Sequence, residues 1–92
     1  MKSDPPHVRL QAFRLLVVSA TVRELAEALE DYSGRAFSAS LLNKIELGKQ
    51  PPSCLHAVWI RRYMSERRFR RSLGEAGDVA ITPDDWADAY SG

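Results

Sequence analysis

Residues 38–53 (SASLLNKIELGKQPPS) carry, at short intervals, polar side chains of the types that bind nucleic acids. Asn43 and Lys44 are residue types that read adenine and guanine edges or bind phosphate. Ala39 and Ser40 are small enough for a helix backbone to approach a neighbour closely, and first-turn amides favour an anion such as phosphate. The pattern therefore favours a contact surface over a purely internal helix.

A short helix is expected to hold these side chains. Ser38 is a good N-cap, and Leu42 and Ile45 have the spacing of inward positions. Gly48 ends the helix in the left-handed conformation that other residues resist, and Pro51-Pro52 prevents the helix from resuming.

Two further helices are predicted before this segment. The first has Asp4 as its cap, with proline in the first turn. Its expected core positions are Val8, Leu10, Phe13, Leu16 and Val17. The second begins at Thr21 with a capping box to Glu24. Its apolar stripe is Val22, Leu25, Ala26 and Leu29. Residues 30–37 are predicted to form a loop, with Phe37 in the core.

Two helices are expected after the segment. Ser53 caps the first, whose predicted inward face is Leu55, Val58, Trp59 and Tyr63. This helix runs into residues 65–73, where Phe69 and Leu73 continue the pattern, and a bend near Ser65 is left open. Residues 74–77 form a linker. Thr82 then caps a short helix whose Trp86 and Tyr90 dock on their own domain or on a partner.

The composition fits one all-α domain, a compact five- or six-helix bundle. Ninety-two residues favour a binding module over an enzyme with a deep cleft. No apolar run approaches the roughly 20 residues that span a bilayer, the N-terminus lacks the apolar core of a signal peptide, and Cys54 is the single cysteine. We expect a cytoplasmic protein.

The net charge of +1 hides an asymmetry. Residues 1–71 hold every Lys and Arg and have a net charge of +6, whereas residues 72–92 have a net charge of −5. The basic cluster comprises Arg61, Arg62, Arg67, Arg68, Arg70 and Arg71. It could bind DNA backbone, form a solvated face, or meet the acidic segment Asp84 to Asp88 in cis or across a dimer.

The sequence resembles the Cro-like (XRE) helix-turn-helix regulators over about residues 8–64. Three stretches carry this resemblance: residues 21–26 (TVRELA), 38–49 (SASLLNKIELGK) and 52–53 (PS). The most specific part is the run Ile-Glu-x-Gly-Lys-x-x-Pro-Ser from Ile45 to Ser53. The resemblance implies a lambda-repressor-like fold. In it the helix after Thr21 crosses the DNA backbone, the helix after Ser38 enters the major groove and the next loop touches phosphate.

Residue by residue, the resemblance places Ala39, Ser40 and Lys44 at the main base-reading positions and Asn43 at an auxiliary one. Leu41 matches a position near the backbone or a thymine methyl. The full set expected to contact DNA is Thr21, Arg23, Arg35, Ser38, Ala39, Ser40, Leu41, Asn43, Lys44, Lys49 and Gln50. Glu46 matches a structural acid, and Leu25, Ala26, Leu42 and Ile45 match the core of the motif.

Two features depart from the family pattern. Val22 stands where the family often has a phosphate-contacting Gln. The connection at residues 30–37 also replaces a tight turn, and Arg35 within it is a candidate replacement phosphate contact.

These observations predict residues 1–73 as a helix-turn-helix DNA-binding domain and residues 74–92 as an acidic extension. We expect a small transcriptional regulator resembling phage Cro-like repressors or small autoregulators. It would bind an inverted-repeat operator in double-stranded DNA as a homodimeric repressor. The expected dimer interface is Tyr63, Phe69, Trp86 and Tyr90. The alternative is a protein-interaction module, such as an antitoxin or anti-repressor, acting through the C-terminal segment.

No enzyme, cofactor or metal function is expected. Cys54 and His56 lack the second ligand pair of a structural zinc site. No serine lies in a glycine elbow or beside a base-orienting pattern.

Overall fold

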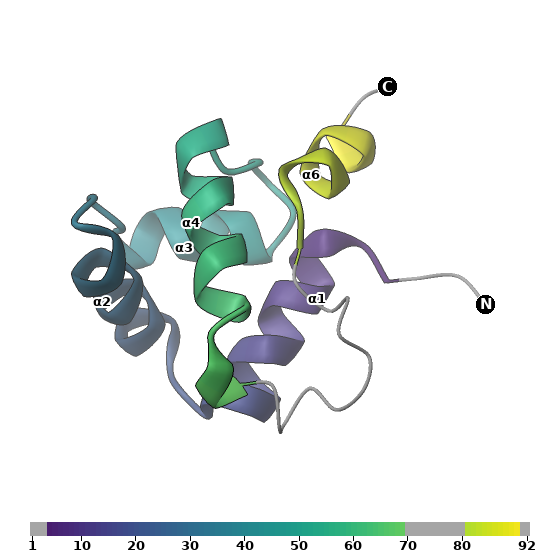
Figure 1. The fold of residues 1–92 in the computed structure, drawn as a ribbon. Coiled ribbons are helices and arrows are strands. Elements are labelled where there is room, and N and C mark those ends of the chain that lie inside the picture. Colours follow the sequence, from purple (N-terminus) through teal and green to yellow (C-terminus); the bar gives the residue numbers. More distant parts are fainter. Residues whose placement is uncertain (1–3, 70–80, 91–92) are drawn as a thin grey trace.

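The computed structural model describes residues 4–69 and 81–90, and these residues contain helices and no β-strand. The expected all-α class is therefore confirmed for this part of the chain. Figure 1 shows α3 running behind α4, with α2 on one side and α1 and α6 on the other. Several predicted features lie outside the described residues: Arg70, Arg71, Leu73 and the linker at 74–77.

The first helix has two parts with different winding. α1 (Pro6–Ala12) is α-helical and continues into η1 (Phe13–Val18), which is π-helical. The prediction that Asp4 caps this helix is wrong. The N-cap residue is Pro5, and no side chain makes a capping hydrogen bond at this end. Ser19 ends η1 in the left-handed region, with φ of 56°.

The predicted core positions of this helix are partly wrong. Leu10 and Phe13 are buried, but Val8 and Leu16 are 37% and 80% exposed. The apolar run at residues 15–18 is longer than one face of a helix can bury, and only its second half packs against the core. The charged Arg14, which the spacing did not place in the core, is buried instead, at 8% exposure.

α2 (Val22–Ser33) begins with the predicted capping box. The Thr21 hydroxyl accepts a hydrogen bond from the Glu24 amide at 3.1 Å, and the Glu24 carboxylate accepts one from the Thr21 amide at 2.9 Å. Hydrogen bonding to the Glu24 carboxylate by the Thr21 backbone amide, and then by the Thr21 side chain, lowers the pKa of Glu24. Leu25, Ala26 and Leu29 are buried as predicted.

The predicted loop at residues 30–37 is wrong in its first half, because α2 continues to Ser33. The Ser33 hydroxyl donates to the Leu29 carbonyl at 2.7 Å, and Gly34 ends the helix with φ of 69°. The Glu30 carboxylate then accepts from the Phe37 amide at 3.1 Å, which draws the chain back toward the helix. Only residues 34–38 connect α2 to α3, and Phe37 is buried as predicted.

α4 (Cys54–Met64) starts at the predicted cap, Ser53, whose hydroxyl accepts from the His56 amide at 3.2 Å. The buried face of α4 is rotated from the predicted one. The buried residues of this helix in the structure are Ala57, Ile60, Tyr63 and Met64. Leu55 is 44% exposed. The helix stops at Met64, and after the bend a helical turn at residues 67–69 returns Phe69 to the core.

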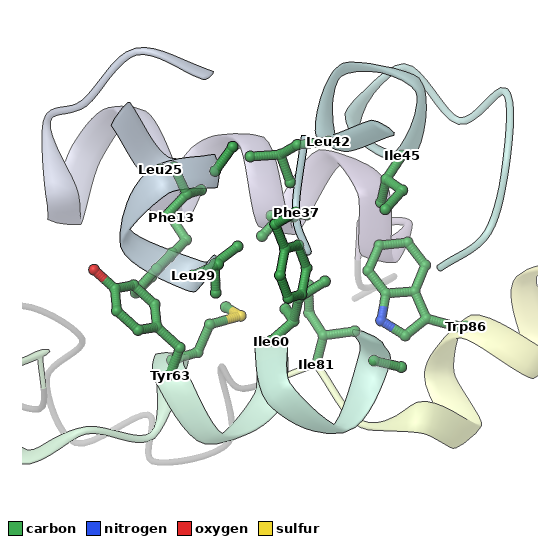
Figure 2. Packing of buried hydrophobic residues seen from close by; sticks show 14 of the residues in the cluster. Phe13, Leu25, Leu29, Phe37, Leu42, Ile45, Ile60, Tyr63, Ile81 and Trp86 are labelled. Atoms are coloured by element: carbon green, nitrogen blue, oxygen red, sulfur yellow. The ribbon is translucent and has the colours of Figure 1, made fainter. Parts of the chain in front are cut away.

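α6 (Pro83–Tyr90) packs on the same core as the other helices. Thr82 is its cap: the Thr82 hydroxyl accepts from the Asp85 amide at 3.2 Å, and the Asp85 carboxylate accepts from the Thr82 amide at 2.9 Å. Ile81 and Trp86 are 0% and 3% exposed and belong to the main apolar cluster. Figure 2 shows the Trp86 ring projecting from α6 toward Ile45 of α3.

Candidate nucleic-acid interface

α3 (Ala39–Glu46) is fixed along its inner side and at both ends. The Ser38 hydroxyl accepts from the Leu41 amide at 3.0 Å, as the sequence predicts. Leu42 and Ile45 are each 0% exposed. Gly48 follows with φ of 74°, and a Cβ built there would lie 3.1 Å from the His7 ring, so both conformation and space favour glycine.

A buried ion pair joins the last residue of α3 to η1. The Arg14 Nε lies 2.9 Å and 3.0 Å from the two carboxylate oxygens of Glu46, and Arg14 Nη1 donates to the Ala20 carbonyl at 2.9 Å. The side chains of Arg14 and Glu46 are only 10% and 3% exposed. Charge-assisted hydrogen bonds of this length are strong and directional, so the pair fixes the end of α3 relative to η1. The sequence gives a signal for Glu46 through the family resemblance but none for Arg14.

The outer side of α3 presents a polar stripe. Ser40, Asn43 and Lys44 are exposed and follow the spacing i, i+3, i+4 of one helix face. Leu47, 52% exposed, continues that spacing although it is absent from the predicted contact set. Glu46 is the only acid in residues 38–50 and is buried in its ion pair, so the exposed charges of this segment are positive.

The other predicted contact residues fall into three groups. The first group lies in the chain on either side of α3: Arg35 is exposed before this helix, and Lys49 and Gln50 are exposed after it. The second group is Thr21 and Arg23, which are exposed at the start of α2. The 12 residues of α2 give it a length of about 18 Å, which separates these two residues from the connection to α3.

Ala39 and Leu41 form the third group, because they are half-buried and pack against the core. Their side chains are therefore less available to an external ligand than those of Ser40, Asn43 and Lys44.

His56 connects the chain before α3 with the chain after it. Its Nε2 donates to the Ala36 carbonyl at 2.9 Å, and its Nδ1 lies 2.8 Å from the Ser53 hydroxyl. Its ring also meets the Phe37 ring edge-on, with 4.5 Å between centroids. Both ring nitrogens are therefore engaged, and the described residues contain no group of three possible metal ligands.

A second basic surface lies at the far end of α4. The Arg62 guanidinium sits 5.0 Å from the centre of the Trp59 ring, and the Arg68 guanidinium sits 5.2 Å from that of Tyr63. The Tyr32 hydroxyl donates a hydrogen bond to the Glu66 carboxylate at 3.3 Å. The pKa of Tyr32 is raised, mainly by burial and secondly by the negative charge of Glu66. These described members of the arginine cluster pack on aromatic rings of their own chain.

The acidic C-terminal helix meets a basic residue of α1. Arg9 Nη1 lies 3.4 Å from the Asp85 carboxylate. The backbone amide of Thr82 lowers the pKa of Asp85 most, and Arg9 adds to this effect, while partial burial opposes it.

Most of the residues predicted for the dimer interface are buried within the single chain. Tyr63, Phe69 and Trp86 are 4%, 8% and 3% exposed, because each fills the core of its own chain. The Phe13 ring lies edge-on to both Tyr63 and Phe69. Those three residues therefore offer almost no surface to a second copy, and only Tyr90, 38% exposed, remains accessible. A pair of aromatics one turn apart is compatible with core or interface, which is why the sequence did not separate the two.

No family model, curated protein or solved structure matches this chain. Within the described residues, no helix is both long enough and apolar enough to cross a membrane.

Proposed function

We propose that the chain is a sequence-specific double-stranded DNA-binding protein and a small transcriptional repressor, with α3 as the helix that enters the major groove. The observation that carries the proposal is the division of α3 into two sides. Ser40, Asn43 and Lys44 project outward, while Leu42, Ile45 and the paired Glu46 hold the opposite side in place. A rigidly mounted helix with an uncharged amide and a cation on its outer side suits the hydrogen-bonding edges of bases.

In this proposal α2, the connection at 34–38 and α3 act as a helix-turn-helix, with a connection longer than the tight family turn. Asn43 reads adenine and Lys44 reads guanine, the pairings that their hydrogen-bonding groups favour. Arg35, Lys49 and Gln50 bind phosphates, and Arg23 and Thr21 approach the backbone from the start of α2.

Half-burial makes Ala39 and Leu41 supporting residues rather than principal base contacts. Leu47 extends the outer stripe and is available to a thymine methyl group.

A homodimer on an inverted repeat remains part of the proposal, because two copies double the number of contacts and match a two-fold operator. Occlusion of a promoter requires no additional domain, which favours repression over activation.

The experiment is a gel shift of the purified protein with the DNA upstream of its own gene. A dimer that makes roughly 6 to 10 phosphate contacts should lose about 10³ to 10⁵ in affinity between 50 and 200 mM salt. An affinity that does not change with salt would refute the proposal.

Substitutions separate base reading from phosphate binding. Lys44→Ala should weaken specific binding more than nonspecific binding, whereas Lys49→Ala should weaken both alike. Arg61→Ala is the matched control, since Arg61 is exposed on α4 and outside the α3 surface. If Arg61→Ala lowers specific binding relative to nonspecific binding as much as Lys44→Ala does, the recognition surface is not on α3.

The second candidate is a protein-interaction module, such as an antitoxin or anti-repressor, acting through the C-terminal segment. The exposed acidic side of α6 and the accessible Tyr90 favour it. Deleting residues 74–92 is a poor test, because the deletion also removes Ile81 and Trp86 from the core. Point substitutions on the surface of α6 are required instead.

A further inference from the structure

An apolar hollow lies where the loop after α3, the start of α4 and α6 meet. Its volume is about 170 Å³, and its wall includes Pro51, Pro52, Cys54, Trp86, Ala87 and Tyr90. A cavity of about 150 Å³ is enough to hold a benzene molecule, so the hollow has room for one aliphatic or aromatic side chain. None of the wall residues carries a charge.

An open groove on the other flank of α6 has the opposite chemistry. Its volume is about 420 Å³ and it lies between α6 and the start of α1. Its lining includes three carboxylates, from Asp4, Asp85 and Asp88, against one guanidinium, from Arg9. α6 itself contains three aspartates and no Lys or Arg. The groove therefore favours a cationic ligand and disfavours the phosphates of DNA.

We propose that α6 and the two flanking depressions form a docking surface for a basic segment of another protein that carries an apolar anchor. The anchor fills the hollow, and Lys or Arg side chains of the same segment reach across α6 into the acidic groove. The two sites are separated by one helix diameter, about 10 Å, which a few residues of extended chain span. Burial of an apolar anchor supplies affinity, and charge complementarity supplies specificity for a basic partner.

This surface is distinct from the outer stripe of α3 and does not depend on it. The hollow adjoins Pro51 and Pro52 but contains none of Ser40, Asn43, Lys44, Lys49 or Gln50. The two proposals therefore rest on different contact residues, and failure of one experiment leaves the other proposal unaffected.

The two tryptophans provide an internal reporter and its control. Trp86 forms part of the hollow, and its indole N–H is buried without a hydrogen-bond partner. Trp59 lies on α4 under Arg62 and outside the hollow. A ¹⁵N-labelled sample of the full chain has two indole N–H signals, one from each residue.

The probe is an acetylated and amidated nonapeptide with a central leucine, a pair of arginines on each side and glycine elsewhere. We expect a saturable shift of the Trp86 indole signal on titration, with the Trp59 signal unchanged. The glutamate counterpart of this peptide should bind at least about tenfold more weakly, because its four charges are repelled by the groove. Replacing the central leucine with glycine should also abolish saturation, because the anchor is then missing.

Two protein variants and one control variant complete the test. Ala87→Leu places a larger side chain at an exposed helix position in the hollow wall and should abolish binding. Asp88→Asn should weaken binding several-fold, whereas Asp31→Asn, at an exposed position on α2, should leave it unchanged. Circular dichroism establishes that each variant is folded.

Three results would overturn the proposal: no saturable Trp86 shift, an equal response to the acidic peptide, or full binding by Ala87→Leu. A Trp86 shift that depends on protein concentration without peptide, together with dimers in sedimentation, would assign the hollow to a second copy of the chain and also overturn it.

Discussion

The substitution Glu46→Gln tests how α3 is held. It replaces the carboxylate with a neutral amide of nearly the same shape and leaves the Arg14 guanidinium, 10% exposed, without its counter-ion. Removing one partner of a buried ion pair costs about 3–5 kcal/mol. A 92-residue chain has a total stability of about 5–14 kcal/mol at 0.05–0.15 kcal/mol per residue, so the loss is a large share of the whole. The midpoint of thermal unfolding should fall by at least about 12 °C.

Urea unfolding followed by tryptophan fluorescence measures this loss. Glu27→Gln, at an exposed position on α2, is the matched control and should change stability by less than about 0.5 kcal/mol. The double variant Arg14→Met/Glu46→Leu removes both charges and should recover at least about 2 kcal/mol of the loss. Complete recovery is not expected, because the Ala20 carbonyl also loses the hydrogen bond from Arg14. A cost below about 1 kcal/mol for Glu46→Gln, the value of an exposed pair, would refute the argument that burial makes the pair essential.

Three further predictions concern the caps and the surface. Asp85→Asn should cost about 1 kcal/mol at pH 7, because a neutral amide oxygen accepts from the Thr82 amide less strongly than the carboxylate and forms no ion pair with Arg9. Since the pKa of Asp85 is lowered in the folded state, its contribution is present above about pH 4 and is lost as pH falls through the folded pKa. The stability difference between wild type and variant, from urea titrations at several pH values, should therefore shrink in acid, and a constant difference would contradict this account. Gly48→Ala should cost about 1–2 kcal/mol for the left-handed backbone, plus the crowding against His7. Adding His7→Ala should relieve only the crowding in the same urea assay, and complete recovery would show that backbone strain is absent. Leu16→Gln should change the unfolding free energy by less than about 0.5 kcal/mol, because Leu16 is 80% exposed, and a loss of several kcal/mol would place it in the core.

The sequence predicts helix ends better than helix faces. Thr21, Ser38, Ser53 and Thr82 all cap the helices that they precede, because a cap depends on residues within one turn of each other. Which side of α4 is buried depends on the positions of other helices. Leu55 fits an apolar stripe as well as Ala57 does, yet only Ala57 is buried.

The candidate site shows the same division. Leu42, Ile45 and Gly48 follow from spacing and turn chemistry alone. Arg14 does not, because its partner Glu46 is 32 residues away, and a lone arginine in an apolar run gives no indication of a buried ion pair.

The docking of α6 has a consequence for the order in which the native structure opens. An eight-residue helix is too short to persist alone in water, so α6 exists only while Ile81 and Trp86 stay seated. The buried indole N–H of Trp86 has no hydrogen-bond partner, so burial of Trp86 is less favourable than its apolar area implies. We therefore expect release of α6 to cost less free energy than unfolding of α1 to α4. Because Trp86 points toward Ile45, each such event would uncover Ile45 on the inner side of α3. An interaction that keeps α6 packed on the core would therefore also increase the fraction of time for which Trp86 packs against α3.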